Sequence, residues 1–137
     1  MRILLTTLLM FAVGPAAAVK AYRAINRLYV VPVANDTFEV IEARGQGGPG
    51  IWCAAADFVR TAGRDVPQQR IYLAKERGPS ATVQGEKAVT FTLTPIEGWE
   101  QQTTYSATTR QVGASFKVSH AYMYCENFLD DFPFGGI

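Results

Sequence analysis

Alternating apolar and polar residues identify one strand of this chain clearly, between residues 87 and 94. Val89, Phe91 and Leu93 lie on one side of an extended backbone, whereas the threonines between and after them lie on the other. A strand with one apolar and one polar face is typical of an antiparallel sheet that buries a single side. The segment therefore predicts a strand of such a sheet.

Further strands are predicted from runs rich in β-branched and aromatic residues. Residues 26–33 and 38–42 are expected to form a hairpin around a turn at Asn35, and Pro32 favours an edge position because it cannot donate to a ladder. A strand at 71–75 is expected to end at the Gly-Pro-Ser of residues 78–80. Two more strands are expected at 103–111 and 114–124; in the second, alternation places Phe116, Val118, His120, Tyr122 and Tyr124 on one face.

Residues 51–62 carry the helical pattern of this chain. Asp57 and Arg60 lie opposite an apolar stripe at spacings of three and four residues, and Gly63 follows as a stop signal. The stripe comprises Trp52, Ala55, Ala56 and Val59.

The order of these elements, β-β-α-β-β-(β)-β, predicts an α+β fold. Strands and helices do not alternate as parallel βαβ units require, and one helix cannot cover both faces of a sheet. We expect an antiparallel sheet of five or six strands with the helix packed on one face.

The first 18 residues have the pattern of an export signal rather than of a folded segment. Arg2 gives a positive start, residues 3–13 are mostly apolar, and small alanines precede a cleavage site near Ala18. The apolar run is shorter than the roughly twenty residues of a membrane-spanning helix. We therefore expect a bacterial-type signal peptide at 1–18 and a single domain at 19–137 with an irregular tail from about residue 127. The mature protein is expected in the periplasm or the medium, without membrane attachment.

Charge excludes the partners that need a strongly basic surface. The chain has 13 Lys and Arg against 12 Asp and Glu, so loss of Arg2 leaves the mature protein formally neutral. Nucleic acid and anionic membrane surfaces are therefore not expected as partners.

Cys53 and Cys125 are the only cysteines of the chain. In an oxidising compartment, two lone cysteines most simply form one disulfide, here between the start of the helix and the last strand. Its long loop corresponds to about 4 kcal/mol of stability in the chain-entropy model. A reactive thiol is the rival interpretation, but no Cys-x-x-Cys motif is present.

The glycine-rich segment before the helix matches the pattern G-x-G-x-x-G at Gly45, Gly47 and Gly50. In a dinucleotide site, such glycines let the backbone approach a pyrophosphate at a helix N-terminus. The preceding strand carries Glu39 and Glu42, however, where a buried parallel strand should be apolar. A flexible loop is therefore the main interpretation, and an anion or small-ligand site at residues 45–50 is the alternative.

His120 is the only histidine of the chain, so any histidine-dependent catalysis would require it. No nucleophile motif such as G-x-S-x-G is present, and an ordinary position among aromatic residues is the simpler interpretation. His120 is thus a weak catalytic candidate, and whether the protein is an enzyme stays open, with a non-enzymatic role favoured.

No cofactor and no metal are expected. Two cysteines and one histidine lack zinc-type spacing, and the adjacent Asp130 and Asp131 lack the staggered spacing of a calcium loop. Phe132 and Phe134 flank a proline in a glycine-rich tail and are hard to bury, which makes them candidates for a docking segment.

Four segments give the chain a resemblance to uncharacterised small exported bacterial proteins with a single disulfide. They are the IWCAAAD of residues 51–57, the IYL of 71–73, the VTFTL of 89–93 and the YMYC of 122–125. The resemblance covers most of the mature chain, but it rests on structural residues and implies no activity.

These observations favour a non-enzymatic envelope or periplasmic interaction module with an envelope protein as partner. The expected contact regions are the threonine-rich face of the sheet and the C-terminal tail. A small hydrolase using His120 and an anion binder at Gly45–Gly50 remain as alternatives; oligomeric state and ligand are not indicated by the sequence.

Overall fold

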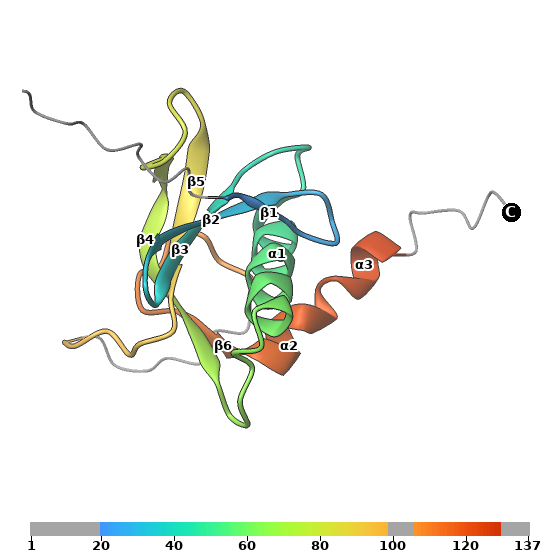
Figure 1. The fold of residues 1–137 in the computed structure, drawn as a ribbon, viewed down its shortest axis with the longest axis vertical. Coiled ribbons are helices and arrows are strands. Elements are labelled where there is room, and N and C mark those ends of the chain that lie inside the picture. Colours follow the sequence, from blue (N-terminus) through green and yellow to red (C-terminus); the bar gives the residue numbers. More distant parts are fainter. Residues whose placement is uncertain (1–19, 99–105, 130–137) are drawn as a thin grey trace, which may run out of the picture.

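The computed structural model describes residues 20–98 and 106–129. The expected signal peptide, the expected docking residues Phe132 and Phe134, and the Asp130–Asp131 pair lie outside the described residues. Within them the chain forms six strands and three helices, and Figure 1 shows α1 packed beside a curved sheet. The elements are β1 (Tyr22–Arg23), β2 (Tyr29–Ala34), β3 (Thr37–Ile41), α1 (Gly47–Thr61), β4 (Arg70–Pro79), β5 (Lys87–Thr92), β6 (Ser115–Lys117), α2 (Val118–Met123) and α3 (Glu126–Leu129).

The strands form one antiparallel sheet in the order β1-β2-β3-β5-β4-β6. This arrangement confirms the predicted α+β class. The predicted hairpin is present as β2 and β3, although β2 begins at Tyr29 rather than at Asn26. Because β1 pairs only with Tyr29 and Val30, Pro32 lies where β2 has no described neighbour on its outer side.

The core lies between α1 and one face of the sheet. Val89 and Phe91 of β5 are fully buried there, as their alternation predicts. The indole of Trp52 packs edge-on against Phe91 and Phe116, with both ring centroids 4.8 Å away. Such aromatic pairs add about 0.5–1.5 kcal/mol each beyond the area that they bury. The helix is thus fixed to the middle of the sheet by a large side chain.

The helix begins earlier than its apolar stripe, at Gly47 instead of residue 51. Pro49 is accommodated because a helix's first turn needs no N–H from that residue. Gly48 is required by close packing, since a Cβ there would lie 1.9 Å from the backbone oxygen of Ala107. The Trp52 indole N–H also donates to the Thr108 oxygen at 2.8 Å. The segment around residue 107 therefore covers the start of α1.

The strand predicted at 114–124 is wrong beyond its first residues. Only Ser115–Lys117 is extended, and α2 follows at once. The alternating aromatics concealed a second pattern, in which Val118, Ala121 and Cys125 are buried at spacings of three and four residues. The disulfide therefore joins α1 to the turn after α2, not to a final strand.

Two other predicted strands also differ from the structure. Of the strand expected at 103–111, residues 106–111 are described and are irregular. Strand β4 continues through Gly78 and Pro79, which were expected to end it, and its register against β5 shifts twice. Such bulges bend a strand and increase its twist. None of the helices in residues 20–98 and 106–129 is long and apolar enough to cross a membrane.

Candidate functional site

The predicted disulfide between Cys53 and Cys125 is confirmed. Both cysteines are fully buried, and their Cα atoms lie 4.9 Å apart although they are separated by 72 positions in the chain. The bond holds the segment after α2 against α1. It thereby fixes one wall of the groove described next.

A groove of about 450 Å³ lies between the end of α1, the loop of residues 65–69 and the start of α2. Its volume is in the range of about 300–1,000 Å³ that is common for ligand sites. Polar and apolar side chains both contribute to it. The lining side chains include Arg60, Asp65, Val66, Lys117, Ser119 and Tyr122.

Arg60 and Tyr122 form the contact that closes one side of the groove. The guanidinium carbon of Arg60 lies 3.8 Å from the centre of the Tyr122 ring, in a cation–π arrangement. Arg60 is exposed and Tyr122 is half-buried. Among residues 20–98 and 106–129, no carboxylate forms an ion pair with Arg60. The N–H groups of Arg60 therefore donate to no carboxylate among the described residues.

A second cation, Lys117, lines the groove from the end of β6. It pairs in register with Arg70 of β4, so two residues of like charge are neighbours on adjacent strands. The Arg70 guanidinium donates to the Ser115 hydroxyl at 2.9 and 3.1 Å but to no described carboxylate. Like charges directly opposite in a sheet are destabilising. The groove therefore carries an excess of positive charge, which only Asp65 offsets among its charged lining residues.

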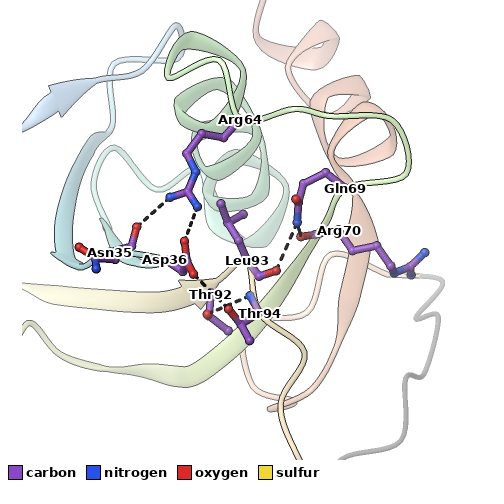
Figure 2. A network of polar contacts seen from close by, with 8 residues as sticks. All are labelled: Asn35, Asp36, Arg64, Gln69, Arg70, Thr92, Leu93 and Thr94. Carbon is purple, nitrogen blue, oxygen red and sulfur yellow. Dashed lines mark hydrogen bonds and ion pairs between the residues drawn. The ribbon is translucent and has the colours of Figure 1, made fainter.

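The region next to the groove, where the β2–β3 turn meets the residues after α1, has the opposite character (Figure 2). We call it the closed end; it consists of Asn35, Asp36, Arg64, Leu93 and Thr94. Arg64 donates to the Asn35 oxygen at 2.7 Å and to the Asp36 carboxylate, which also accepts from the Thr94 hydroxyl. The hydrogen bond from Arg64 holds the pKa of Asp36 below its usual value.

Leu93 connects this closed end to the start of β4. Its backbone N–H donates to the backbone oxygen of Asp36 at 2.9 Å. Its own backbone oxygen accepts from the side-chain amide of Gln69 at 3.2 Å (Figure 2). Gln69 also donates to the Arg70 oxygen at 2.8 Å. Polar groups at this end therefore bind one another.

Glu39 is buried to 1% exposure in the middle of β3, which sequence reasoning did not foresee. The loop after β4 supplies its partners. The Ser80 hydroxyl and the Ala81 and Thr82 N–H groups donate at 2.5, 3.0 and 3.0 Å, and the Thr82 hydroxyl donates as well. Desolvation raises the pKa of Glu39, but these four donors outweigh it and hold the pKa below its usual value. A serine and a threonine just after β4 were the available signal.

Asp57 also differs from its expected exposed position, because it is 8% exposed. Its carboxylate accepts from the Tyr22 hydroxyl at 2.8 Å and from the Ile25 N–H at 2.9 Å. Burial, together with the neighbouring Asp57 carboxylate, raises the pKa of the Tyr22 phenol. The contact fastens the N-terminal strand to α1.

Backbone conformation and close packing account for the three glycines of the G-x-G-x-x-G pattern. Gly45 and Gly47 have φ values of +64° and +67°, which glycine adopts most easily. Gly50 lies inside α1, where a Cβ would meet the Gln46 side chain at 2.5 Å. That side chain is itself bound to Asn26, which also donates to the Gly50 oxygen. An anion site at this loop stays a prediction.

His120 lies exposed on α2 and does not line the groove. Its ring centre is 4.9 Å from that of Phe116 and 6.3 Å from that of Tyr124. Within the described residues, no carboxylate or hydroxyl group hydrogen-bonds to it, and no cluster of three potential metal ligands occurs. Its catalytic role also stays a prediction.

Sequence reasoning missed the groove because it assigned Lys117 and Tyr122 to a continuous strand. Arg60 was recognised as lying opposite the apolar stripe, but not as facing another helix. The helical spacing of the apolar residues Val118, Ala121 and Cys125 was the available signal for α2.

No protein-family model, curated protein or solved structure matches this chain.

Proposed function

We propose that this protein is an exported, non-enzymatic binding protein of the bacterial envelope or medium, and that it binds its partner in the groove between α1 and α2. The export-signal pattern of residues 1–18 and the buried Cys53–Cys125 disulfide support a site of action outside the cytoplasm. Periplasm and medium are equally consistent with both features.

The main support for binding is that the cations lining the groove lack a described acidic partner, whereas two arginines elsewhere have one. Arg64 and Arg77 bind Asp36 and Glu42, whereas Arg60 and Lys117 have no described carboxylate partner. Both line one concavity: Arg60 lies on α1, which the disulfide joins to the segment after α2, and Lys117 lies on β6, directly before α2. Charged side chains at a rigid concave surface are suited to binding another molecule.

The hydrolase alternative has less support. Catalysis by His120 requires a hydroxyl or a carboxylate within hydrogen-bond reach, and the described residues place aromatic rings there instead. The anion site at Gly45–Gly50 also has less support, because Pro49 lacks an N–H and the Gln46 side chain is bound to Asn26.

Site-specific crosslinking in the producing cell tests the proposal. A photo-crosslinking amino acid is placed at Ser119, which lines the groove, and in a second variant at Lys87, which is exposed at the far end of the β4–β5 hairpin. We expect a discrete adduct from Ser119 that is lost when Lys117→Glu is added. Identical adducts from both positions, or none from Ser119, would contradict the proposal.

N-terminal sequencing of the exported protein tests its location independently. A mature N-terminus near Val19 is expected. Retention of residues 1–18 in the natural protein would remove the basis for assigning it to the envelope.

A further inference from the structure

We infer that the groove binds an acidic peptide segment of a partner protein, in which a carboxylate contacts Arg60 and Lys117 and a neighbouring apolar side chain contacts Val66. This inference rests on the proposed function and adds the chemistry of its ligand.

The geometry of Arg60 favours a carboxylate as the bound group. Tyr122 covers one face of the guanidinium at 3.8 Å, and this contact orients the group while leaving the N–H groups at its edge available. A carboxylate accepts two parallel hydrogen bonds from that edge, an arrangement that is stronger and more specific than a single contact. The guanidinium of Arg60 is thus pre-organised to bind a carboxylate.

The pairing of Lys117 with Arg70 points to an anion independently. The two residues are register partners on β6 and β4, and Ser115 supplies hydrogen bonds to Arg70 but no negative charge. An anion bound beside Lys117 would relieve this repulsion. Arg60 and Lys117 are the two cations of the groove lining and Asp65 is its one acid, so the lining is positively charged although the mature chain is formally neutral.

The remaining lining favours a peptide over a free anion. Val66 is 59% exposed, a large exposure for an apolar side chain, and it borders the groove next to Pro67. Ser119 adds a hydroxyl that can bind a peptide backbone. A simple anion such as phosphate would use the cations alone, whereas a peptide contacts charged, polar and apolar groups together.

Selection from a random twelve-residue peptide library tests this inference on the disulfide-bonded exported protein. We expect enrichment of Asp or Glu next to a large apolar residue. The enrichment should disappear with the double substitution Arg60→Gln and Lys117→Gln, and persist with the control Lys87→Gln. Selection without an acidic preference, or an acidic preference that survives the double substitution, would overturn the inference.

Affinity measurements on one selected peptide sharpen the test. Replacing its acidic residue by the amide should weaken binding by about tenfold or more, because a charge-assisted hydrogen bond is lost. Arg60→Lys should also weaken binding, since it keeps the charge but loses the planar fork. Asp65→Asn should strengthen binding, and 0.5 M salt should weaken it. An unchanged affinity in the amide peptide or in Arg60→Lys contradicts a carboxylate ligand.

Two further measurements distinguish an acidic peptide from other possible occupants of the groove. Inorganic phosphate that displaces the peptide at submillimolar concentration would replace the inference by a simple anion site. Asp130→Asn with Asp131→Asn in the full chain should leave peptide affinity unchanged; a marked increase would identify the protein's own tail as the occupant and overturn the inference.

Failure of the inference and failure of the proposed function are distinguishable. An adduct from Ser119 in cells, together with peptides lacking acidic residues, refutes only the acidic ligand. Absence of any adduct from Ser119 refutes the use of the groove itself.

Discussion

Arg60 and Arg64 lie four residues apart at the end of α1, yet their surroundings differ. Arg64 reaches across the closed end to Asp36 and to the Asn35 oxygen. Arg60 lies over the Tyr122 ring at the edge of the groove, with no described carboxylate in contact. The first arginine therefore connects two segments of the same chain beside a small cavity of about 150 Å³, whereas the second lines the larger groove without a described carboxylate partner.

The difference shows how charge at a fold's surface can be interpreted. An ion pair between exposed groups contributes little to stability, and an arginine that lacks one loses little. Unpaired charge is therefore weak evidence for function by itself. It becomes informative at the groove because a second lining cation, Lys117, and a cavity of about 450 Å³ accompany it.

Removing the disulfide should have the largest effect and should separate the two regions. In Cys53→Ala with Cys125→Ala, the unfolding free energy is expected to fall by about 4 kcal/mol, because the unfolded chain regains the entropy of a long loop. Denaturant unfolding measures this change. Hydrogen exchange should show a greater loss of protection in α2 than at the closed end, since the bond holds the segment after α2 against α1.

Reduction of the unsubstituted protein provides the control, and it should reproduce the loss seen in the double variant. Equal loss of protection in α2 and at Asp36 would show that the groove and the closed end depend on the disulfide to the same degree. The distinction between the two regions would then be wrong.

Glu39, like Asp36 of the closed end, is a carboxylate bound by groups of the same chain, but it is buried and its donors are uncharged. Glu39→Gln should lower the unfolding free energy by about 1–3 kcal/mol, since an amide N–H₂ group would face a backbone or hydroxyl donor. The native pKa is below the ordinary glutamate value of 4.5, which the unfolded chain is expected to have. The carboxylate's stabilisation is therefore complete above that value and is lost as the pH falls through the native pKa.

The measurement is thermal unfolding between pH 2 and 7, with Glu76→Gln, exposed on β4, as the matched control. The stability difference between Glu39→Gln and the unsubstituted protein should narrow at low pH, while the control should differ little throughout. A difference that is constant with pH would contradict a bound carboxylate at residue 39.

The arginines themselves should give the smallest effects on stability. Arg64→Ala is expected to lower Tm less than Glu39→Gln does, because the ion pair with Asp36 is largely exposed. Its effect should diminish below the lowered pKa of Asp36, where that carboxyl is protonated. Arg60→Ala should lower Tm less still, by an amount independent of pH in the same range. An acid-sensitive Arg60→Ala effect would reveal a carboxylate partner within the chain.

Much of the sheet could be predicted because its signals are local. Alternation in residues 87–94 identified β5 and its buried face, and apolar runs around a turn identified β2 and β3. The apolar stripe around Trp52 identified α1. The two cysteines required only the assumption of an oxidising compartment. In each case a few neighbouring residues contained the information.

The groove could not be predicted because its residues meet only through the fold. Arg60, Asp65 and Lys117 belong to three different segments, and no short motif unites them. Residues 114–124 fit both an alternating pattern and a helical one, and the packing of Ala121 and Cys125 against α1 favoured the helix. Glu39 likewise acquires its partners from a loop about forty residues later.

The disulfide has a consequence for when the groove forms during biogenesis. One wall comes from the middle of the chain and the other from near its end, and a covalent bond between Cys53 and Cys125 keeps them together. Thiols stay reduced in the cytoplasm, so with the export proposed above a newly made chain would lack this bond before translocation. Oxidation after translocation would then act as the maturation step that makes the concave surface permanent.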